Sequence, residues 1–119
     1  MGGGVTESSL TLYHDRSLTL TRHFLVLRGV SRLLGRRATI EYSQILAFRL
    51  RDARDYPSGR VPAWGISDDN VWFAKDPQRR RREHAIELVM KDGRTLGVTP
   101  AHASRVAELL IGRGVSRLT

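Results

Sequence analysis

Residues 86–112, IELVMKDGRTLGVTPAHASRVAELLIG, carry the clearest structural pattern in the chain. Apolar residues alternate with other residues on both sides of Asp92-Gly93, which is the period-two pattern of a β-strand. Asp-Gly between two such runs is typical of a β-hairpin with a two-residue type I′ turn, because both central positions of that turn need a positive φ. The sequence therefore predicts a hairpin over residues 86–98.

An amphipathic helix is predicted directly after this hairpin. Thr99 is the expected N-cap, and Pro100 suits the first helical position, where its missing N–H costs nothing. Gly112 is the expected left-handed residue after the helix, and Arg113 lies where the helix dipole favours a cation. One apolar stripe with helical spacing runs between these ends: Ala103, Val106, Ala107, Leu110 and Ile111.

Short alternating or apolar runs earlier in the chain predict further strands. Arg22-His23, between two of these runs, is either a tight turn or a bulge that changes the register, and the pattern leaves both open. Polar stretches at 29–37, 51–62 and 75–83 are predicted loops. The predicted strands cover residues 10–13, 17–21, 24–27, 38–42, 45–50, 63–66 and 71–74, and the last two form a hairpin.

This order of elements predicts a mainly β (α+β) fold of about seven antiparallel strands, followed by one C-terminal amphipathic helix that covers the open face or end of the sheet. A parallel α/β sheet is excluded, because no crossover helix is predicted before residue 99. A chain of 119 residues supports one compact domain. We expect a disordered leader at 1–7, the domain at 8–112 and a short C-terminal tail at 113–119.

The composition narrows the classes of function. Lys and Arg number 20 against 12 Asp and Glu, so the net charge is +8 and the surface attracts anions such as nucleic acid, an anionic membrane or an acidic protein. The chain has no cysteine, which excludes disulfides, thiolate metal sites and a cysteine nucleophile. No apolar run is long enough to span a membrane and no secretory signal is present, so we expect a cytoplasmic protein.

Two basic regions are candidate binding sites. The densest is Arg79–Arg82, which is either an anion-binding loop or a solvated loop, since Asp76 and Glu83 flank it and cancel part of its field. The second region surrounds Leu33-Leu34, which either touch a membrane or partner or fold back onto the core. Its basic residues are Arg28, Arg32, Arg36 and Arg37.

No catalytic or metal-binding motif is present. Asp68-Asp69 is better explained as a turn than as a catalytic carboxylate pair. Trp64 is expected in the core rather than stacked on bases, and the adjacent Trp72 and Phe73 are expected to point to opposite faces of their strand. The four histidines do not have the spacing of metal ligands along the chain. They are His14, His23, His84 and His102. We therefore expect a protein that is not an enzyme and holds no cofactor and no metal.

Three short stretches resemble the bacterial PH-like domains. They are residues 40–45 (IEYSQI), Trp64-Gly65-Ile66, and the run from Ile86 through Asp92-Gly93-Arg94 to Thr99-Pro100. The resemblance spans roughly residues 8–111. It implies a bent, partly open antiparallel barrel with a C-terminal helix at one end, and a binding module without catalytic residues.

The expected function is therefore binding. A half-open barrel leaves strand edges, which suit interaction with another protein or self-assembly into a homo-oligomer. The alternative is an anionic ligand, a lipid headgroup or nucleic acid, bound through the Arg79–Arg82 loop. PH domains that bind phosphoinositides carry several basic residues in their first hairpin loop, whereas His14-Asp15-Arg16 contains an acid in that place.

Overall fold

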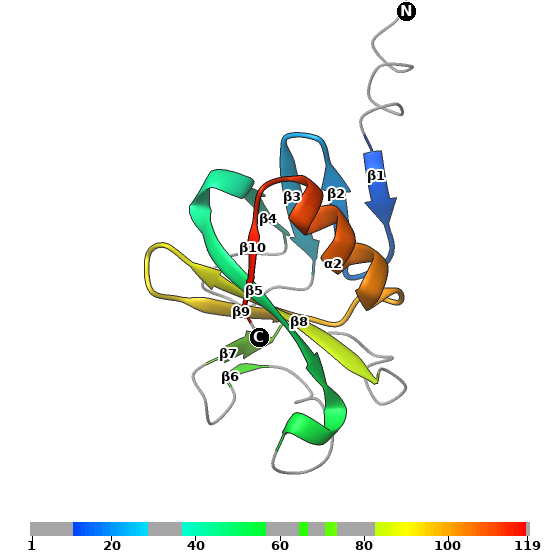
Figure 1. The fold of residues 1–119 in the computed structure, drawn as a ribbon, viewed down its shortest axis with the longest axis vertical. Coiled ribbons are helices and arrows are strands. Elements are labelled where there is room, and N and C mark those ends of the chain that lie inside the picture. Colours follow the sequence, from blue (N-terminus) through cyan, green and yellow to red (C-terminus); the bar gives the residue numbers. More distant parts are fainter. Residues whose placement is uncertain (1–10, 29–36, 57–64, 67–70, 74–82, 119) are drawn as a thin grey trace, which may run out of the picture.

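The computed structural model describes residues 11–28, 37–56, 65–66, 71–73 and 83–118. These residues form two β-sheets, one α-helix and two short 3-10 helices (Figure 1). The first sheet is an antiparallel meander in chain order, made of β1 (Thr11–His14), β2 (Leu18–Thr21), β3 (Phe24–Arg28) and β4 (Arg37–Glu41). The predicted mainly β fold with one C-terminal helix is confirmed at this level.

The second sheet has the strand order β10-β5-β8-β9-β7-β6. Its long central pair, β5 and β8, is antiparallel over the whole length of β5. The 3-10 helices η1 (Tyr42–Gln44) and η2 (Ala53–Asp55) precede and follow β5, and the α-helix is α2 (Ala103–Gly112). The strands are β5 (Ile45–Asp52), β6 (Gly65–Ile66), β7 (Val71–Phe73), β8 (His84–Met90), β9 (Thr95–Val98) and β10 (Ser116–Leu118).

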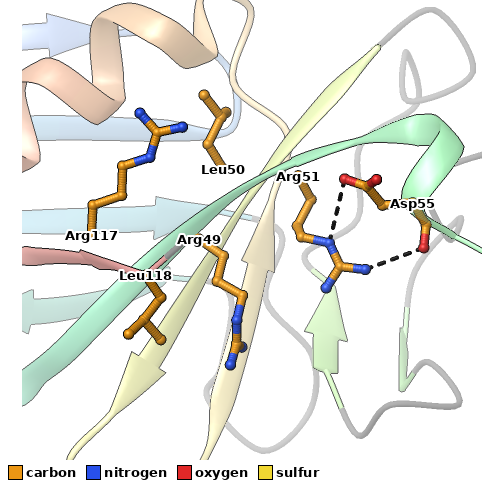
Figure 2. A pocket seen from close by; sticks show the side chains of 6 residues that line it. All are labelled: Arg49, Leu50, Arg51, Asp55, Arg117 and Leu118. Atoms are coloured by element: carbon orange, nitrogen blue, oxygen red, sulfur yellow. Dashed lines mark hydrogen bonds and ion pairs between the residues drawn. The ribbon is translucent and has the colours of Figure 1, made fainter.

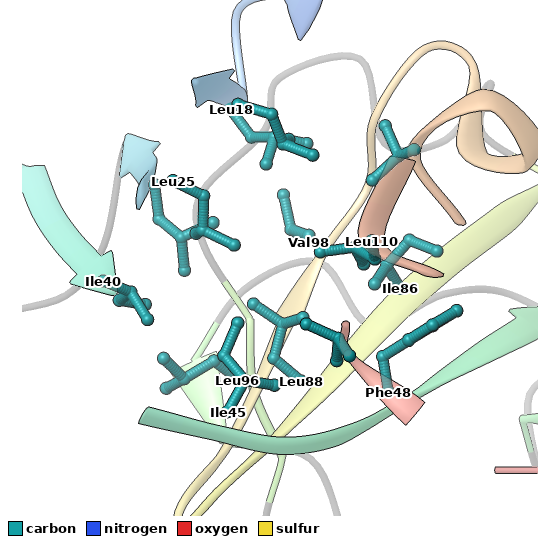
Figure 3. Close-up of a cluster of buried hydrophobic side chains, with 14 of the residues drawn as sticks. Leu18, Leu25, Ile40, Ile45, Phe48, Ile86, Leu88, Leu96, Val98 and Leu110 are labelled. Atoms are coloured by element: carbon teal, nitrogen blue, oxygen red, sulfur yellow. The ribbon is translucent and has the colours of Figure 1, made fainter. Parts of the chain in front are cut away.

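One hydrophobic core joins both sheets to the helix (Figure 3). The alternating positions of β8 and β9 supply it from the second sheet, and the apolar stripe predicted for the helix supplies it from α2. The core contains Leu18, Leu20, Leu25, Leu27, Ile40, Ile45, Phe48, Ile86, Leu88, Met90, Leu96, Val98, Ala103, Val106, Ala107, Leu110 and Val115. Because members come from every large element, the fold packs as a single unit.

The strand count and pairing correct two predictions. Ten strands lie in the described residues, in two sheets, rather than about seven in one barrel. β10 is the strand that the sequence does not predict: it has three residues, too few to show a clear alternation, and lies at the edge of the second sheet. Two pairs, β7 with β9 and β10 with β5, are parallel rather than antiparallel. The pairing of β10 with β5 is possible because α2 returns the chain to the edge of β5.

The β8–β9 hairpin is confirmed, but its turn is not the predicted two-residue type I′ turn. The N–H of Gly93 donates to the carbonyl of Met90 at 3.1 Å, and the N–H of Met90 donates to the carbonyl of Arg94 at 2.8 Å. The loop therefore has three residues, and only its last one, Gly93 with φ +96°, is a left-handed glycine. Asp92 stabilises this turn by accepting from the N–H of Arg94 at 3.0 Å.

Both predicted ends of the helix are displaced. Thr99 is buried and is not the N-cap; His102 holds that position. The helix includes Gly112 and ends in a Schellman motif at Gly114, whose φ is +88°. In this motif the N–H of Val115 donates to the carbonyl of Leu110 at 3.0 Å, and Val115 joins the core.

The structure of four further segments can be compared with what the sequence predicts. Arg22-His23 is a tight turn, because Leu20 pairs with Leu25 across it. The loop expected from residue 51 starts later: β5 runs to Asp52, and Tyr56 is buried. Residues 116–118, placed in the tail, form β10, whereas the leader at 1–7 lies outside the described residues. The hairpin of β6 and β7 is confirmed.

Candidate functional site

Most of the predicted basic site lies outside the described residues. This applies to Arg79, Arg80, Arg81 and Arg82, and also to Arg32 and Arg36. Arg37 is exposed at the start of β4 and pairs in register with Arg28 at the end of β3. Arg28 is held in place, since its Nη1 donates to Thr19 Oγ1 at 2.6 Å.

A different basic site lies at the edge of the second sheet. It is a pocket of about 480 Å³, open to solvent, formed where the short strand β10 lies beside the longer β5 (Figure 2). We call it the β10-edge pocket. Its lining residues are Arg49, Leu50, Arg51, Asp55, Arg117 and Leu118.

The alternation of β5 explains how arginines come to line this pocket. Successive side chains of a strand point to opposite faces. Leu50 points toward the side of α2, where it packs on the main core, whereas Arg49 and Arg51 point to the other face (Figure 2). Arg117 leaves β10 on the Leu50 side, so arginines flank the edge from both faces.

One row of paired residues crosses the sheet behind the pocket. Leu118 pairs with Arg49, Arg49 with Glu87, Glu87 with Gly97, and Gly97 with Phe73. Gly97 leaves room for the Phe73 ring, because a Cβ at this position would lie 2.5 Å from two of the ring carbons. Phe73 belongs to a second apolar cluster with Tyr56, Val71 and Ala85.

Glu87 is the buried acid in this row. Its side chain is 1% exposed, and its Oε2 accepts a hydrogen bond from the Tyr56 hydroxyl at 2.7 Å. Its Oε1 lies 3.5 Å from Arg51 Nη1 and 3.8 Å from Arg49 Nη1. Burial, and then the hydrogen bond to Glu87, raises the pKa of Tyr56 far above its usual range, so the phenol stays a donor.

Arg51 is the most firmly held of the pocket arginines. Its Nη2 donates to the Asp55 carbonyl at 3.2 Å, and its Nε lies 3.7 Å from the Asp55 carboxylate (Figure 2). The guanidinium also lies over the Tyr56 ring, 5.1 Å from its centre, which is a cation–π contact. Tyr56 itself meets Phe73 edge-on at 5.9 Å between ring centres.

Exposed apolar side chains gather on the same elements. Leu46, Ile111 and Leu118 are the exposed large hydrophobic residues of the described part of the chain, at 58%, 53% and 37%. Leu46 is the extra residue of a bulge in β5, since the register shifts between Ile45 and Ala47. The three elements that carry them, β5, α2 and β10, contact one another.

The other predicted sites resolve only in part. Phe73 is buried on the second cluster, whereas Trp64 and the side chain of Trp72 lie outside the described residues. Within the described ranges, no group of three or more His, Cys, Asp or Glu side chains is arranged to hold a metal ion. Among those same residues, no helix is long and apolar enough to cross a membrane.

The β10-edge pocket could not be found from the sequence. In the sequence, Arg49 lies in the apolar run 45–50, and Arg51 begins the predicted loop 51–62. Arg117 lies in the expected C-terminal tail. The one available signal is the alternation of arginine with apolar residues across 48–51, which places two arginines on one face of a strand. Comparison of the chain with family models, with curated proteins and with solved structures finds no match.

Proposed function

We propose that this chain is a non-enzymatic binding module that engages a protein, either a partner or a second copy, at the edge formed by β10. The observation that carries the proposal is the exposure of this edge. β10 has three residues, all exposed, and it forms the outermost strand of the second sheet. An exposed strand edge is a template for pairing with another chain.

An exposed apolar side chain on the edge strand supports the same surface. Leu118 of β10 is 37% exposed and pairs in register with Arg49, whereas Ile111 is exposed on α2. Covering an apolar side chain at an interface is favourable because it removes apolar surface from water. Leu46 adds a third such side chain on β5, beside the pair β5–β10.

The order of the elements supports a PH-like architecture. An antiparallel meander of four strands is followed by β5, β8 and β9, which pair antiparallel in chain order, and then by α2. β6, β7 and β10 are additions at the margins of the second sheet. This arrangement agrees with the resemblance drawn from residues 40–45 and 86–100, and with a binding rather than a catalytic role.

A charge placed on the edge tests this function. Leu118→Asp should abolish association, because it puts a charge into the apolar contact on the edge strand. Thr39→Asp, at an exposed position of β4 in the other sheet, is the matched control and should have no effect. The measurement is molar mass by light scattering over a concentration series, together with cross-linking to bound protein. A strictly monomeric wild type with no cross-linked partner would exclude the proposed function.

A second candidate function is the binding of an anionic ligand, a lipid headgroup or nucleic acid, by Arg79–Arg82. One described feature bears on the other predicted basic region: the segment that contains Arg32 and Arg36 is flanked by Arg28 and Arg37, which pair in register. Retention on heparin or on anionic liposomes should fall with salt and fall again when Arg79–Arg82 are changed to Ala. Unchanged retention in that variant would exclude this candidate.

A further inference from the structure

We infer that the β10 edge receives an acidic, extended segment of a partner protein, whose carboxylates bind Arg49 and Arg117. The inference rests on the proposed function and adds the chemistry of the partner. Three arginines and one acid, Asp55, line the pocket, so its lining has a surplus of two positive charges. The buried Glu87 neutralises one of them from beneath the pocket, and one remains for a ligand.

Two of the three guanidinium groups are available to a ligand. Arg49 is 42% exposed, and its ion pair with Glu87 is 3.8 Å long, beyond hydrogen-bond distance. Arg117 is exposed, and its guanidinium has no ion pair or hydrogen bond among the described residues. Arg51 is engaged by Asp55, Glu87 and Tyr56, so it adds to the positive field of the pocket without offering a free donor. Arginine binds carboxylates through two parallel hydrogen bonds, which favours an acidic ligand.

The position of the arginines favours an extended chain. Arg117 lies on the Leu50 side of the edge, while Arg49 and Arg51 lie on the opposite side (Figure 2). An extended segment places alternate side chains on two faces, so it can present carboxylates to both sides at once. Leu50 and Leu118 also line the pocket and suit apolar residues between the acidic ones.

The net charge favours an acidic partner over a second copy. The chain carries +8, so two copies repel each other, most strongly when basic surfaces face one another. A partner segment rich in Asp or Glu gains from the same field, both in its association rate and at the pocket.

Fluorescence polarisation with two labelled octapeptides tests the inference. One peptide repeats Glu-Glu-Val-Val, which places carboxylates on both faces of an extended chain, and the other has Gln in place of every Glu. The wild type should bind the Glu peptide at least about tenfold more tightly than the Gln peptide, and the difference should shrink with added salt. Equal affinities for the two peptides would overturn the inference.

Two charge-matched variants locate the binding. Arg49→Gln/Arg117→Gln should weaken the Glu peptide about tenfold and leave the Gln peptide unchanged. Arg22→Gln/Arg105→Gln removes the same charge from exposed positions that do not line the pocket, and its effect should stay below about twofold. Equal losses in the two variants would show a general charge effect and overturn the inference.

A third variant separates the inference from the proposed function. Leu118→Ser, at a side chain only partly covered, should weaken both peptides if the edge binds an extended chain. If it does so while the Glu and Gln peptides bind alike, the edge function stands and the acidic preference fails.

Inorganic phosphate and phosphatidylglycerol vesicles are the remaining probes. Binding of either one that depends on Arg49 and Arg117, without binding of the Glu peptide, would overturn the inference in favour of a small anion or a membrane.

Discussion

Gly97 is the residue on which the packing of the second cluster depends. It lies in β9 between Glu87 and Phe73 in the row that crosses the sheet. A Cβ built at Gly97 would lie 2.5 Å from two carbons of the Phe73 ring and 2.8 Å from a third. Glycine is required here because of a close approach, since the ring occupies the space that any other side chain would fill.

We predict that Gly97→Ala destabilises the protein by about 1–3 kcal/mol, because the Phe73 ring must leave its place between Gly97 and Tyr56. Gly112→Ala is the control: no atom lies within 4 Å of its added Cβ and the position is helical, so the change should be neutral or stabilise by up to about 1 kcal/mol. The measurement is the free energy of unfolding in urea. Equal stability of Gly97→Ala and the wild type would show that the ring moves at no cost.

Glu87 shows what the sequence could not predict at this scale. Its place between Ile86 and Leu88 correctly assigns it to the face opposite the main core. A polar residue on such a face is expected in solvent, but Glu87 is buried. Its partners Tyr56 and Arg51 come from other parts of the chain, and no local pattern relates them to β8.

At the scale of elements, Asp15 joins the β1–β2 turn to the start of α2. Its carboxylate accepts from the N–H of Ala101 at 2.9 Å, from Ser17 Oγ at 2.8 Å and from the N–H of Leu18 at 3.0 Å, and it also bonds the Tyr13 hydroxyl. Burial alone would raise the pKa of Asp15, but these hydrogen bonds outweigh burial and hold it below its usual value. Asp15 thus holds the segment that leads into α2, although the amide it binds precedes the N-cap His102 and does not belong to the first turn.

We predict that Asp15→Ala lowers the free energy of unfolding by about 1–2 kcal/mol at neutral pH. Because the folded-state pKa of Asp15 is depressed, its contribution is complete above the unfolded-state pKa and is lost as the pH falls through the folded-state value. The difference between wild type and variant should therefore shrink below about pH 4. Glu108→Ala, at an exposed helical site, is the control. A difference independent of pH between 7 and 3 would contradict this role.

Local pairings were predictable, and distant ones were not. The hairpins β6–β7 and β8–β9 join neighbouring runs, so turn residues and alternation identify them. The parallel pairs join β7 to β9 and β10 to β5, across intervening strands or the helix. Their formation depends on where tertiary packing places the segments, and a three-residue strand such as β10 carries too little pattern of its own. The β10-edge pocket depends on that pairing and was missed with it.

For the whole molecule, the shared core determines how the two sheets unfold. Leu25 of β3 and Leu88 of β8 belong to the same buried cluster, together with residues of α2 (Figure 3). We predict that Leu25→Ala and Leu88→Ala each cost about 2–5 kcal/mol, and that each lowers hydrogen-exchange protection equally in β3 and in β8. Leu46→Ala, an exposed leucine of β5, is the control and should stay within about 0.5 kcal/mol of the wild type. If Leu25→Ala lowered protection in the first sheet alone, the two sheets would be separate folding units, and a ligand at the β10 edge would stabilise only the second.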